Sequence, residues 1–325
     1  MATKSLHAND LDPESELTGP VIINQPTKGL PHLRLGELWE YRYLMIYVIK
    51  RDVVVRYKQT VFGLSWAAIN PLITMVVFSF VFGSLLRVDT QGVPYPLFSL
   101  TALVPWTMFA KGLTNSATSI HSNSNIITKI YFPRIIAPVS AFANSFIDFV
   151  VSLIVLLLMI VGYLVLAPGL IGMVPDGASA EMVEAASHVR VFGPGPIVLV
   201  MIPLFSMIVI LSGLGLGFWF SALQVRMRDI NYIIPFVLQI GQYLTPIAYS
   251  SSIIARFSQH DGNLWQFLYG LNPLVTAIGG FRWAFYNLPF PDTPSVIASV
   301  LSCLVIFVTG IYFFRYSEAK FVDYL

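Results

Sequence analysis

Long apolar segments alternate with short polar connections along most of the 325-residue chain. Six such segments stand out, at about 65–86, 96–116, 135–167, 196–222, 231–252 and 294–315. Because about 20 apolar residues cross the hydrocarbon core of a bilayer as a helix, the pattern predicts six transmembrane helices. The fold class that follows is an all-α membrane protein with six spans.

A shorter apolar stretch precedes the first span. Residues 43–49, YLMIYVI, are too few to cross and are flanked by Glu40, Arg42, Lys50 and Arg51. This composition is typical of a helix that lies in the plane of the membrane interface. We therefore expect three parts, namely a flexible cytoplasmic tail at 1–35, an amphipathic interface helix at 36–60 and the six-span transmembrane domain at 61–325.

The connection before the last predicted span is also distinctive. Residues 253–293 include LNPLVTAIGGFRWAFYN, which is apolar but too interrupted to cross the membrane twice. It predicts re-entrant or interfacial helices, with backbone breaks at Asn272–Pro273 and at Gly279–Gly280. Arg282 then lies near the outer mouth of a pathway, where its guanidinium can meet lipid phosphates.

Three glycines spaced two residues apart mark the fourth segment, which contains SGLGLGFWF. Gly213, Gly215 and Gly217 allow a neighbouring helix to approach closely, as small residues do in membranes. No lysine follows them to complete a phosphate-binding loop, so close packing is their expected role.

Composition and charge place the chain in a membrane and orient it. Hydrophobic residues make up 56% of the chain and charged residues 11%, as in integral membrane proteins. If the spans alternate in direction, one side carries Arg87, Arg190, Arg256 and Arg282, and the remaining fifteen of the 19 Lys and Arg lie on the other. By the positive-inside rule both termini are cytoplasmic. The net charge of +2 gives no indication of nucleic-acid binding.

A membrane-embedded enzyme is one alternative class. Ser65 in GLSWA lacks the second glycine of a nucleophile turn, and the five histidines fall in predicted tails or loops. The sequence has no H-E-x-x-H motif and no phosphate-binding loop, and its single cysteine, Cys303, excludes an internal disulfide. We therefore expect no catalytic residues, no metal site and no cofactor in this chain.

An ion-coupled transporter is a second alternative, and it would need several ionisable groups inside the membrane. Asp148 is the only carboxylate well inside a predicted span. With no buried His, Lys or second acid expected beside it, Asp148 is predicted to have a hydrogen-bonded structural role or to lie near a wet cavity.

Six sequence blocks carry a resemblance to a known family. They are RDVVVRYKQTVFGLSWAAINPLITMVVFSFVFG at 51–83, NIITKIYFPRIIAPVSA at 125–141, VRMRDINYIIPF at 225–236, YLTPIAYS at 243–250, LNPLVTAIGGFRWAF at 271–285 and EAKFVDYL at the C-terminus. In this order the chain resembles, over about 36–325, the membrane subunit of ABC-2 type exporters of the polysaccharide and polyol phosphate group. The outward connection at 168–195 and the N-terminal tail are longer than in that group.

The resemblance implies a permease that exports a lipid-linked polysaccharide, such as O-antigen, across the bacterial inner membrane. Export of teichoic acid or of another lipid-linked or amphiphilic substrate is the alternative within the family. The resemblance also implies a homodimer that works with two copies of a separate ABC ATPase subunit, which would hold ATP and Mg. Six spans from one chain rarely enclose a channel wide enough for a glycan, which favours the dimer independently.

A polar and aromatic stripe follows one face of the first span. Trp66, Asn70 and Thr74 recur at i, i+4 and i+8. Such residues either bond neighbouring helices together or, as the exporter resemblance favours, line a path for sugar chains. Trp106 and Tyr249 are further candidates for the lining, and packing roles explain them equally well.

Two basic or aromatic clusters are expected to contact other molecules. Arg51, Arg56 and Lys58 can capture the phosphate of a lipid-linked substrate, while simple topological anchoring is the alternative. The connection 121–134 is predicted to form a short helix that binds in a groove of the ATPase that the resemblance implies. Its proposed contact residues are Ile127, Lys129, Tyr131, Phe132 and Arg134. The alternative is an ordinary cytoplasmic loop.

Overall fold

The computed structural model describes residues 36–58, 63–124, 133–167, 169, 171–172, 184, 186–227, 229–251, 264–318 and 321. Within these residues the secondary structure is helical throughout and contains no strand, which confirms the all-α fold class there. The elements are α1 (Gly36–Glu40), α2 (Arg42–Tyr57), the 3-10 helix η1 (Gly63–Ser65), α3 (Trp66–Phe78), the π-helix η2 (Ser79–Leu85), α4 (Tyr95–Ser122), α6 (Ile136–Leu166), the 3-10 helix η4 (Gly195–Ile197), α8 (Val198–Arg226), α9 (Ile230–Leu244), α11 (Leu264–Gly270), α12 (Pro273–Tyr286) and α13 (Thr293–Glu318).

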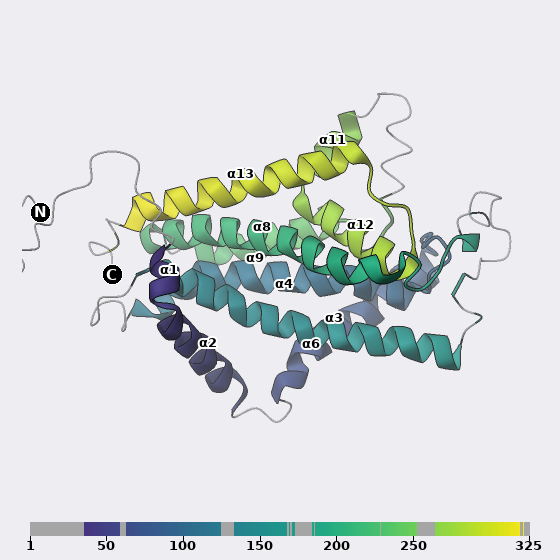
Figure 1. Ribbon diagram of the computed structural model, residues 1–325, viewed down its shortest axis with the longest axis horizontal. Coiled ribbons are helices and arrows are strands. Elements are labelled where there is room, and N and C mark those ends of the chain that lie inside the picture. Colours follow the sequence, from purple (N-terminus) through teal and green to yellow (C-terminus); the bar gives the residue numbers. More distant parts are fainter. Residues whose placement is uncertain are drawn as a thin grey trace, which may run out of the picture. The chain divides into compact units, whose positions relative to one another are not determined.

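Helix α4 is the centre of the bundle and packs against α3, α6, α8, α9 and α12 (Figure 1). Nineteen of its 28 residues are buried. Most of its Ser and Thr hydroxyls donate to carbonyls of the same helix, as where the Thr101 hydroxyl donates to the Leu97 carbonyl at 2.7 Å, whereas the Ser116 hydroxyl donates to the carbonyl of Pro138 of α6 at 2.9 Å. Because protein surrounds α4, this helix tolerates many polar side chains without exposing them to lipid.

Among the described residues, four helical segments are long and apolar enough to cross a membrane by length and composition. They are Gly63–Leu85, Ile136–Leu166, Gly195–Arg226 and Thr293–Glu318, and they coincide with the first, third, fourth and sixth predicted spans. The second and fifth predicted spans coincide with α4, which carries Lys111 and many Ser and Thr, and with α9, which has only 15 residues. Neither of these two helices meets both criteria of length and hydropathy.

Glycines bring α8 and α13 into backbone contact, as the spacing in α8 predicts. A Cβ atom added at Gly215 would lie 2.7 Å from the Cα of Phe307. From the other side, a Cβ at Gly310 would meet the carbonyl oxygen of Gly215. Each glycine therefore accommodates the backbone of the facing helix.

In its described part, from residue 264 on, the segment before the last span forms two short helices, α11 and α12, with one break between them. Asn272 caps α12, since its side chain accepts a hydrogen bond from the Leu274 amide at 3.1 Å. The predicted second break is wrong, because Gly279 and Gly280 lie inside α12. They leave room for Pro291 and for the ring of Phe205, which a Cβ atom at these positions would meet.

Arg282 on α12 has a different environment from the lipid phosphates predicted for it. Arg282 is only 4% exposed. Its guanidinium donates to the carbonyls of Ile247, at 2.9 Å, and Tyr249, at 3.1 Å, and it lies 3.5 Å from the ring centre of Phe98. A buried cation needs such partners, so Arg282 ties α12 to α4 and to the segment that follows α9.

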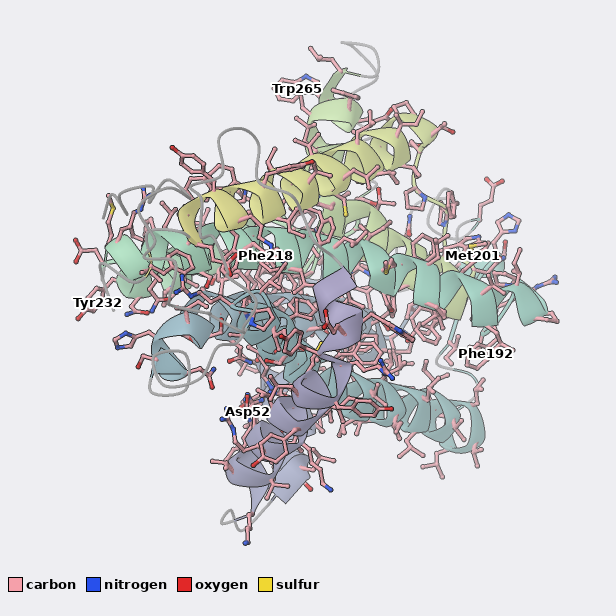
Figure 2. All side chains as sticks on the ribbon, turned by 60° about the vertical axis from the view of Figure 1, so that its left-hand side comes forward. Asp52, Phe192, Met201, Phe218, Tyr232 and Trp265 are labelled. Atoms are coloured by element: carbon pink, nitrogen blue, oxygen red, sulfur yellow. The ribbon has the colours of Figure 1, made fainter. Side chains whose placement is uncertain are left out.

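Helix α9 packs against α4 and α8 yet leaves most of its side chains exposed. Tyr232, for example, is 81% exposed and extends from the bundle, whereas Phe218 on α8 lies inside it (Figure 2). Only Ile230 and Ile234 of α9 are buried. An apolar helix with so little cover requires lipid or another protein surface around it.

Candidate functional site

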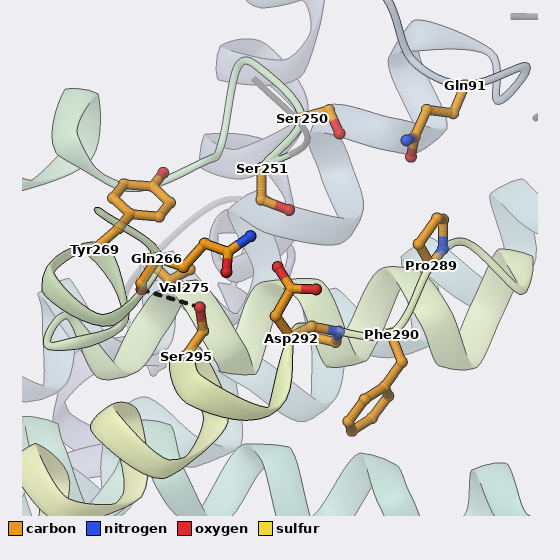
Figure 3. A pocket seen from close by; sticks show the side chains of 11 residues that line it. Gln91, Ser250, Ser251, Gln266, Tyr269, Val275, Pro289, Phe290, Asp292 and Ser295 are labelled. Carbon is orange, nitrogen blue, oxygen red and sulfur yellow. Dashed lines mark hydrogen bonds between the residues drawn. The ribbon is translucent and has the colours of Figure 1, made fainter. Parts of the chain in front are cut away.

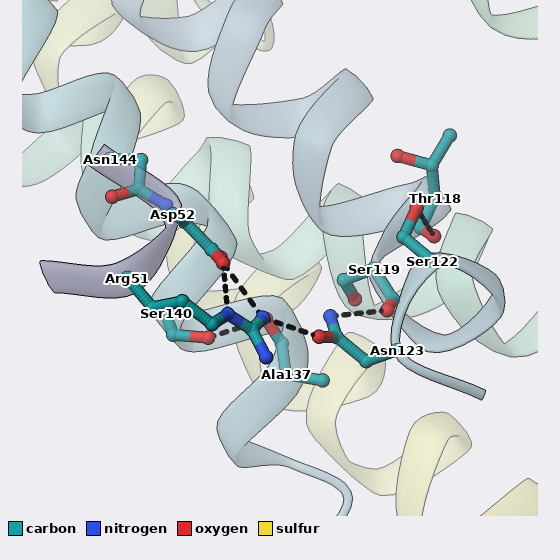
Figure 4. Close-up of polar contacts among 9 residues, drawn as sticks. All are labelled: Arg51, Asp52, Thr118, Ser119, Ser122, Asn123, Ala137, Ser140 and Asn144. Carbon is teal, nitrogen blue, oxygen red and sulfur yellow. Dashed lines mark hydrogen bonds and ion pairs between the residues drawn. The ribbon is translucent and has the colours of Figure 1, made fainter. Parts of the chain in front are cut away.

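Polar and charged residues gather where α2 meets the bundle. Helix α2 packs against α6. The Arg51 guanidinium donates to the Asp52 carboxylate at 2.7 Å and to the side-chain oxygen of Asn123 at 2.8 Å (Figure 4). The Asn144 amide reaches Asp52 at 3.5 Å. The cluster therefore connects α2, the end of α4 and α6.

A second polar cluster surrounds Asp148, whose side chain is 8% exposed. The Lys111 ammonium lies 3.2 Å from one carboxylate oxygen, and the Arg56 guanidinium lies 3.7 Å from it. The Tyr57 hydroxyl donates to the other oxygen. Burial, with the adjacent Asp148, raises the pKa of Tyr57 to about 12, so the phenol keeps its proton and remains a donor.

The expectation that Asp148 lacks a lysine beside it is therefore wrong. Lys111 and Asp148 are the single charged residues of the second and third predicted spans. A buried charge is stable only when it is paired, and this pair satisfies that requirement across α4 and α6. This sequence signal was sufficient to suggest the pair, because two lone opposite charges in adjacent spans neutralise each other.

The three proposed capture residues have unequal surroundings. Arg51 and Arg56 contact the carboxylates of Asp52 and Asp148, respectively. Lys58 follows the last residue of α2 and is exposed. The contacts favour a role for Arg51 and Arg56 in attaching α2 to the bundle, and they leave Lys58 accessible to an external anion.

The predicted stripe lies along one side of α3. Trp66 is 43% exposed and Asn70 is also exposed, while Thr74 is partly buried and donates to the Asn70 carbonyl at 3.0 Å. The neighbouring side of α3 contacts α6, where the Ser152 hydroxyl donates to the carbonyl of Ala67 at 3.0 Å. Helix α3 therefore presents an indole and a carboxamide away from its contact with α6.

Trp106 and Tyr249 have packing environments, which was one of the two roles predicted for them. Trp106 is 5% exposed, stacks at a tilt on Phe109 with ring centres 5.7 Å apart, and lies over Gly241 of α9. The Tyr249 hydroxyl bonds the Tyr269 hydroxyl at 3.0 Å. The contacts of Trp106 are thus with α4 and α9, and the Tyr249 hydroxyl contacts α11.

Most of the proposed ATPase contact lies outside the described residues, namely Ile127, Lys129, Tyr131 and Phe132. Arg134 is described and donates to the carbonyl of Glu318, at the end of α13. Its guanidinium also lies 5.8 Å from the ring centre of Phe321. Arg134 therefore anchors the start of α6 to the C-terminal end of α13.

The described residues contain no group of three or more His, Cys, Asp or Glu side chains that could hold a metal ion. The two clusters at α2 consist of ion pairs and amide contacts among their own members. Their chemistry suits the attachment of a helix and the presentation of cations at a surface.

Comparison with known sequences gives matches over most of the chain. A family model described as ABC-2 type transporter matches residues 43–286. The O-antigen export system permease protein RfbA of Myxococcus xanthus is 25% identical over 288 residues, which are 88% of this chain and 97% of that protein. RfbA of Klebsiella pneumoniae is 30% identical over 254 residues, covering 78% and 83%. The inner membrane transport permease YadH of Escherichia coli K12 is 27% identical over 255 residues, covering 77% and 85%.

Proposed function

The chain belongs to the ABC-2 type transporter family, and from this premise we propose that it moves a lipid-linked, O-antigen-like polysaccharide from the cytoplasm to the periplasm. It is a membrane permease, and its relatives are transport subunits. The observation that carries the proposal is the likeness to two O-antigen export permeases over 97% and 83% of their length. The export of O-antigen in their names, and the inner membrane in the name of YadH, are extended here to this chain.

The proposed topology has six spans and two cytoplasmic termini. Its spans are η1–α3–η2, α4, α6, α8, α9 and α13. Helix α4 has 28 residues, about 42 Å of helix, and its burial within the bundle supports a spanning role despite its polar side chains. Helix α9 is shorter and would need the residues that follow it to complete a crossing. In this topology α2 lies in the cytoplasmic interface, and α11 and α12 enter the membrane from the outer side.

The working unit is proposed to be a homodimer. The uncovered surface of α9 and the exposed side of α3 supply apolar and aromatic area for a second copy or for a path between copies. Trp66, Asn70 and Thr74 would line that path, because pyranose faces stack on indole rings and hydroxyls exchange hydrogen bonds with amides. Trp106 and Tyr249 are not included in the proposed path, because their contacts are those of packing residues.

Energy is proposed to come from two copies of a separate ABC ATPase subunit, which would bind ATP and Mg. No P-loop motif occurs in this sequence. The segment 121–134 remains the proposed contact, with Ile127, Lys129, Tyr131 and Phe132 reaching the ATPase. The anchoring of Arg134 at the end of α13 supports transmission of motion into two spans.

Substrate capture is proposed at the cytoplasmic surface around Lys58. A lipid-linked glycan presents a phosphate or diphosphate at this depth, and each nearby cation attracts it by roughly 1 kcal/mol. The half-exposed Arg56 adds to the same surface, whereas Arg51 holds α2 through Asp52 and Asn123.

Deletion of the gene in its own bacterium tests the proposal. We expect loss of surface polysaccharide and accumulation of a lipid-linked glycan in the inner membrane, both reversed when the wild-type gene is returned. Mass spectrometry of the accumulated lipid separates the alternatives, because teichoic acid would appear as a polyol phosphate chain. Unchanged surface polysaccharide with no accumulated lipid-linked intermediate would contradict the proposal.

A further inference from the structure

A polar cavity of about 150 Å³ lies among segments that come from distant parts of the chain. It is lined by Gln91, Ser250, Ser251, Gln266, Tyr269, Val275, Pro289, Phe290, Pro291, Asp292 and Ser295 (Figure 3). These residues belong to the turn before α4, the segment after α9, the helices α11 and α12, the connection into α13 and the first turn of α13. In the proposed topology all of these segments face the outer side of the membrane.

Hydrogen-bonding groups converge in this cavity. Figure 3 shows the polar ends of Ser251, Gln266 and Asp292 directed toward one space, with the Gln91 amide facing it from above. Within the described part of the chain, the side chains of Gln91, Gln266 and Asp292 have no hydrogen-bond partner. The cavity therefore offers one carboxylate and two carboxamides to a ligand.

The other walls are apolar and held in place by packing. The ring of Phe290 stands edge-on to Trp283, with ring centres 5.2 Å apart. Tyr269 is fixed through its hydroxyl to that of Tyr249 at 3.0 Å. Within the lining, the Ser295 hydroxyl donates to the Gln266 carbonyl at 3.0 Å and joins α13 to α11. These contacts make the cavity preformed, which lowers the ordering cost of binding.

We propose that this cavity binds one neutral pyranose ring of a glycan on the outer side of the membrane. The inference rests on the proposed function, because it takes the exported polysaccharide as the source of the ring. A pyranose has an apolar C–H face and a rim of hydroxyls, and the lining offers both apolar groups, such as Val275 and Pro289, and polar groups, namely the two amides and Asp292. Hydroxyls donate strong hydrogen bonds to a carboxylate.

Size and charge exclude other ligand classes. The cavity is smaller than the roughly 300 Å³ at which drug-sized ligands begin, so it suits one ring and not an oligosaccharide. Asp292 repels phosphates and uronic acids. A single carboxylate with amides and hydroxyls is a poor site for a divalent cation, which prefers several charged oxygen ligands.

Binding can be measured on the full-length chain in lipid nanodiscs by saturation-transfer NMR titration. The probes are methyl α-D-mannopyranoside and methyl β-D-galactopyranoside, with acyclic D-mannitol and anionic methyl β-D-glucuronoside as controls. We expect saturable binding in the millimolar range for at least one neutral pyranoside, and none for either control.

Two variants locate the site and a third controls for charge. We expect Asp292→Asn and Gln266→Ala to weaken pyranoside binding about tenfold, since each removes an acceptor for sugar hydroxyls. The Asp292 side chain has no hydrogen-bond partner in the described part of the chain, so Asp292→Asn removes the charge without breaking a contact at the start of α13. Glu184→Gln, at an exposed acid outside the cavity, should leave binding unchanged.

The outcomes separate this inference from the proposed function. If the wild-type chain exports glycan in cells yet binds neither pyranoside, or if both cavity variants bind as the wild type does, the cavity assignment is overturned and the proposed function stands. If a pyranoside binds as described but the deletion strain exports its polysaccharide normally, the cavity assignment stands and the proposed function fails.

Discussion

At the scale of single residues, Asp148 helps to attach helix α2 to the bundle. One carboxylate with an 8% exposed side chain contacts Lys111 on α4 and both Arg56 and Tyr57 on α2. Its own position is on α6. The contacts join three helices through one group, which makes Asp148 sensitive to substitution.

A double-mutant cycle tests this pairing. We expect Asp148→Asn to lower the free energy of unfolding by about 2 kcal/mol, less than for a fully buried pair because Lys111 and Arg56 are partly exposed. Adding Lys111→Met should recover part of the loss, with a coupling energy of about 1 kcal/mol. Unfolding in mixed detergent micelles measures both values, and strictly additive effects would show that the two groups do not interact.

The cationic residues at the end of α2 lead to a second prediction, which separates capture from attachment. Lys58→Gln should raise the substrate concentration for half-maximal export about fivefold, because it removes roughly 1 kcal/mol of attraction to lipid phosphate. Arg51→Gln is the matched control. It breaks the contacts with Asp52 and Asn123 and should lower stability without shifting the titration.

Export is titrated in reconstituted vesicles and normalised to inserted protein. An unaltered curve for Lys58→Gln, or an equal shift for both variants, would leave topological anchoring as the explanation for these charges.

At the scale of helices, the crossing of α8 and α13 depends on glycine. Gly215→Ala would place a methyl group 2.7 Å from the Cα of Phe307 and force the helices apart, at a cost of about 1–3 kcal/mol. Gly162→Ala on α6 is the control, because a Cβ atom there meets nothing within 4 Å. Unfolding measurements that gave both substitutions the same small effect would contradict the close packing.

The proposed coupling helix gives another prediction at this scale. Replacement of Ile127, Tyr131 and Phe132 by alanine should leave the chain inserted and uncouple ATP hydrolysis from export, since buried aliphatic and aromatic anchors commonly contribute 2 or more kcal/mol each to an interface. ATPase activity and export are measured on the same vesicles. Unchanged assembly with the ATPase and unchanged export would exclude these side chains as anchors.

Periodicity and small-residue spacing predicted the helices and the glycine contact, because both are local properties of the sequence. The pair formed by Lys111 and Asp148 was missed, although two lone opposite charges in adjacent spans suggest it; only the rotation of α4 against α6 shows that the two side chains meet. Gly279 and Gly280 were taken for a break, although glycine also admits a neighbouring side chain in a continuous helix. The residues that line the cavity around Asp292 come from four separate stretches of the chain, and no local sequence pattern predicts that these stretches meet.

At the scale of the whole molecule, the helices differ in how far other helices bury them. Helix α4 is enclosed by protein and carries polar groups, whereas α9 exposes an apolar surface although it is short. One chain therefore combines an enclosed scaffold with a helix that needs further cover. In the proposed transporter this cover comes from lipid and from a second copy, while the ATPase supplies the energy.

The most direct test of the central claim is to measure ATP-driven transfer of a lipid-linked polysaccharide across a bilayer. The full chain and its ABC ATPase partner are reconstituted in vesicles that contain the lipid-linked glycan, and transfer across the bilayer is followed after ATP or an ion gradient is supplied. We predict transfer that requires both subunits and ATP, and that an ion gradient alone does not support. Transfer driven by the gradient without ATP, or no transfer by the complete ATP-hydrolysing complex, would contradict the account.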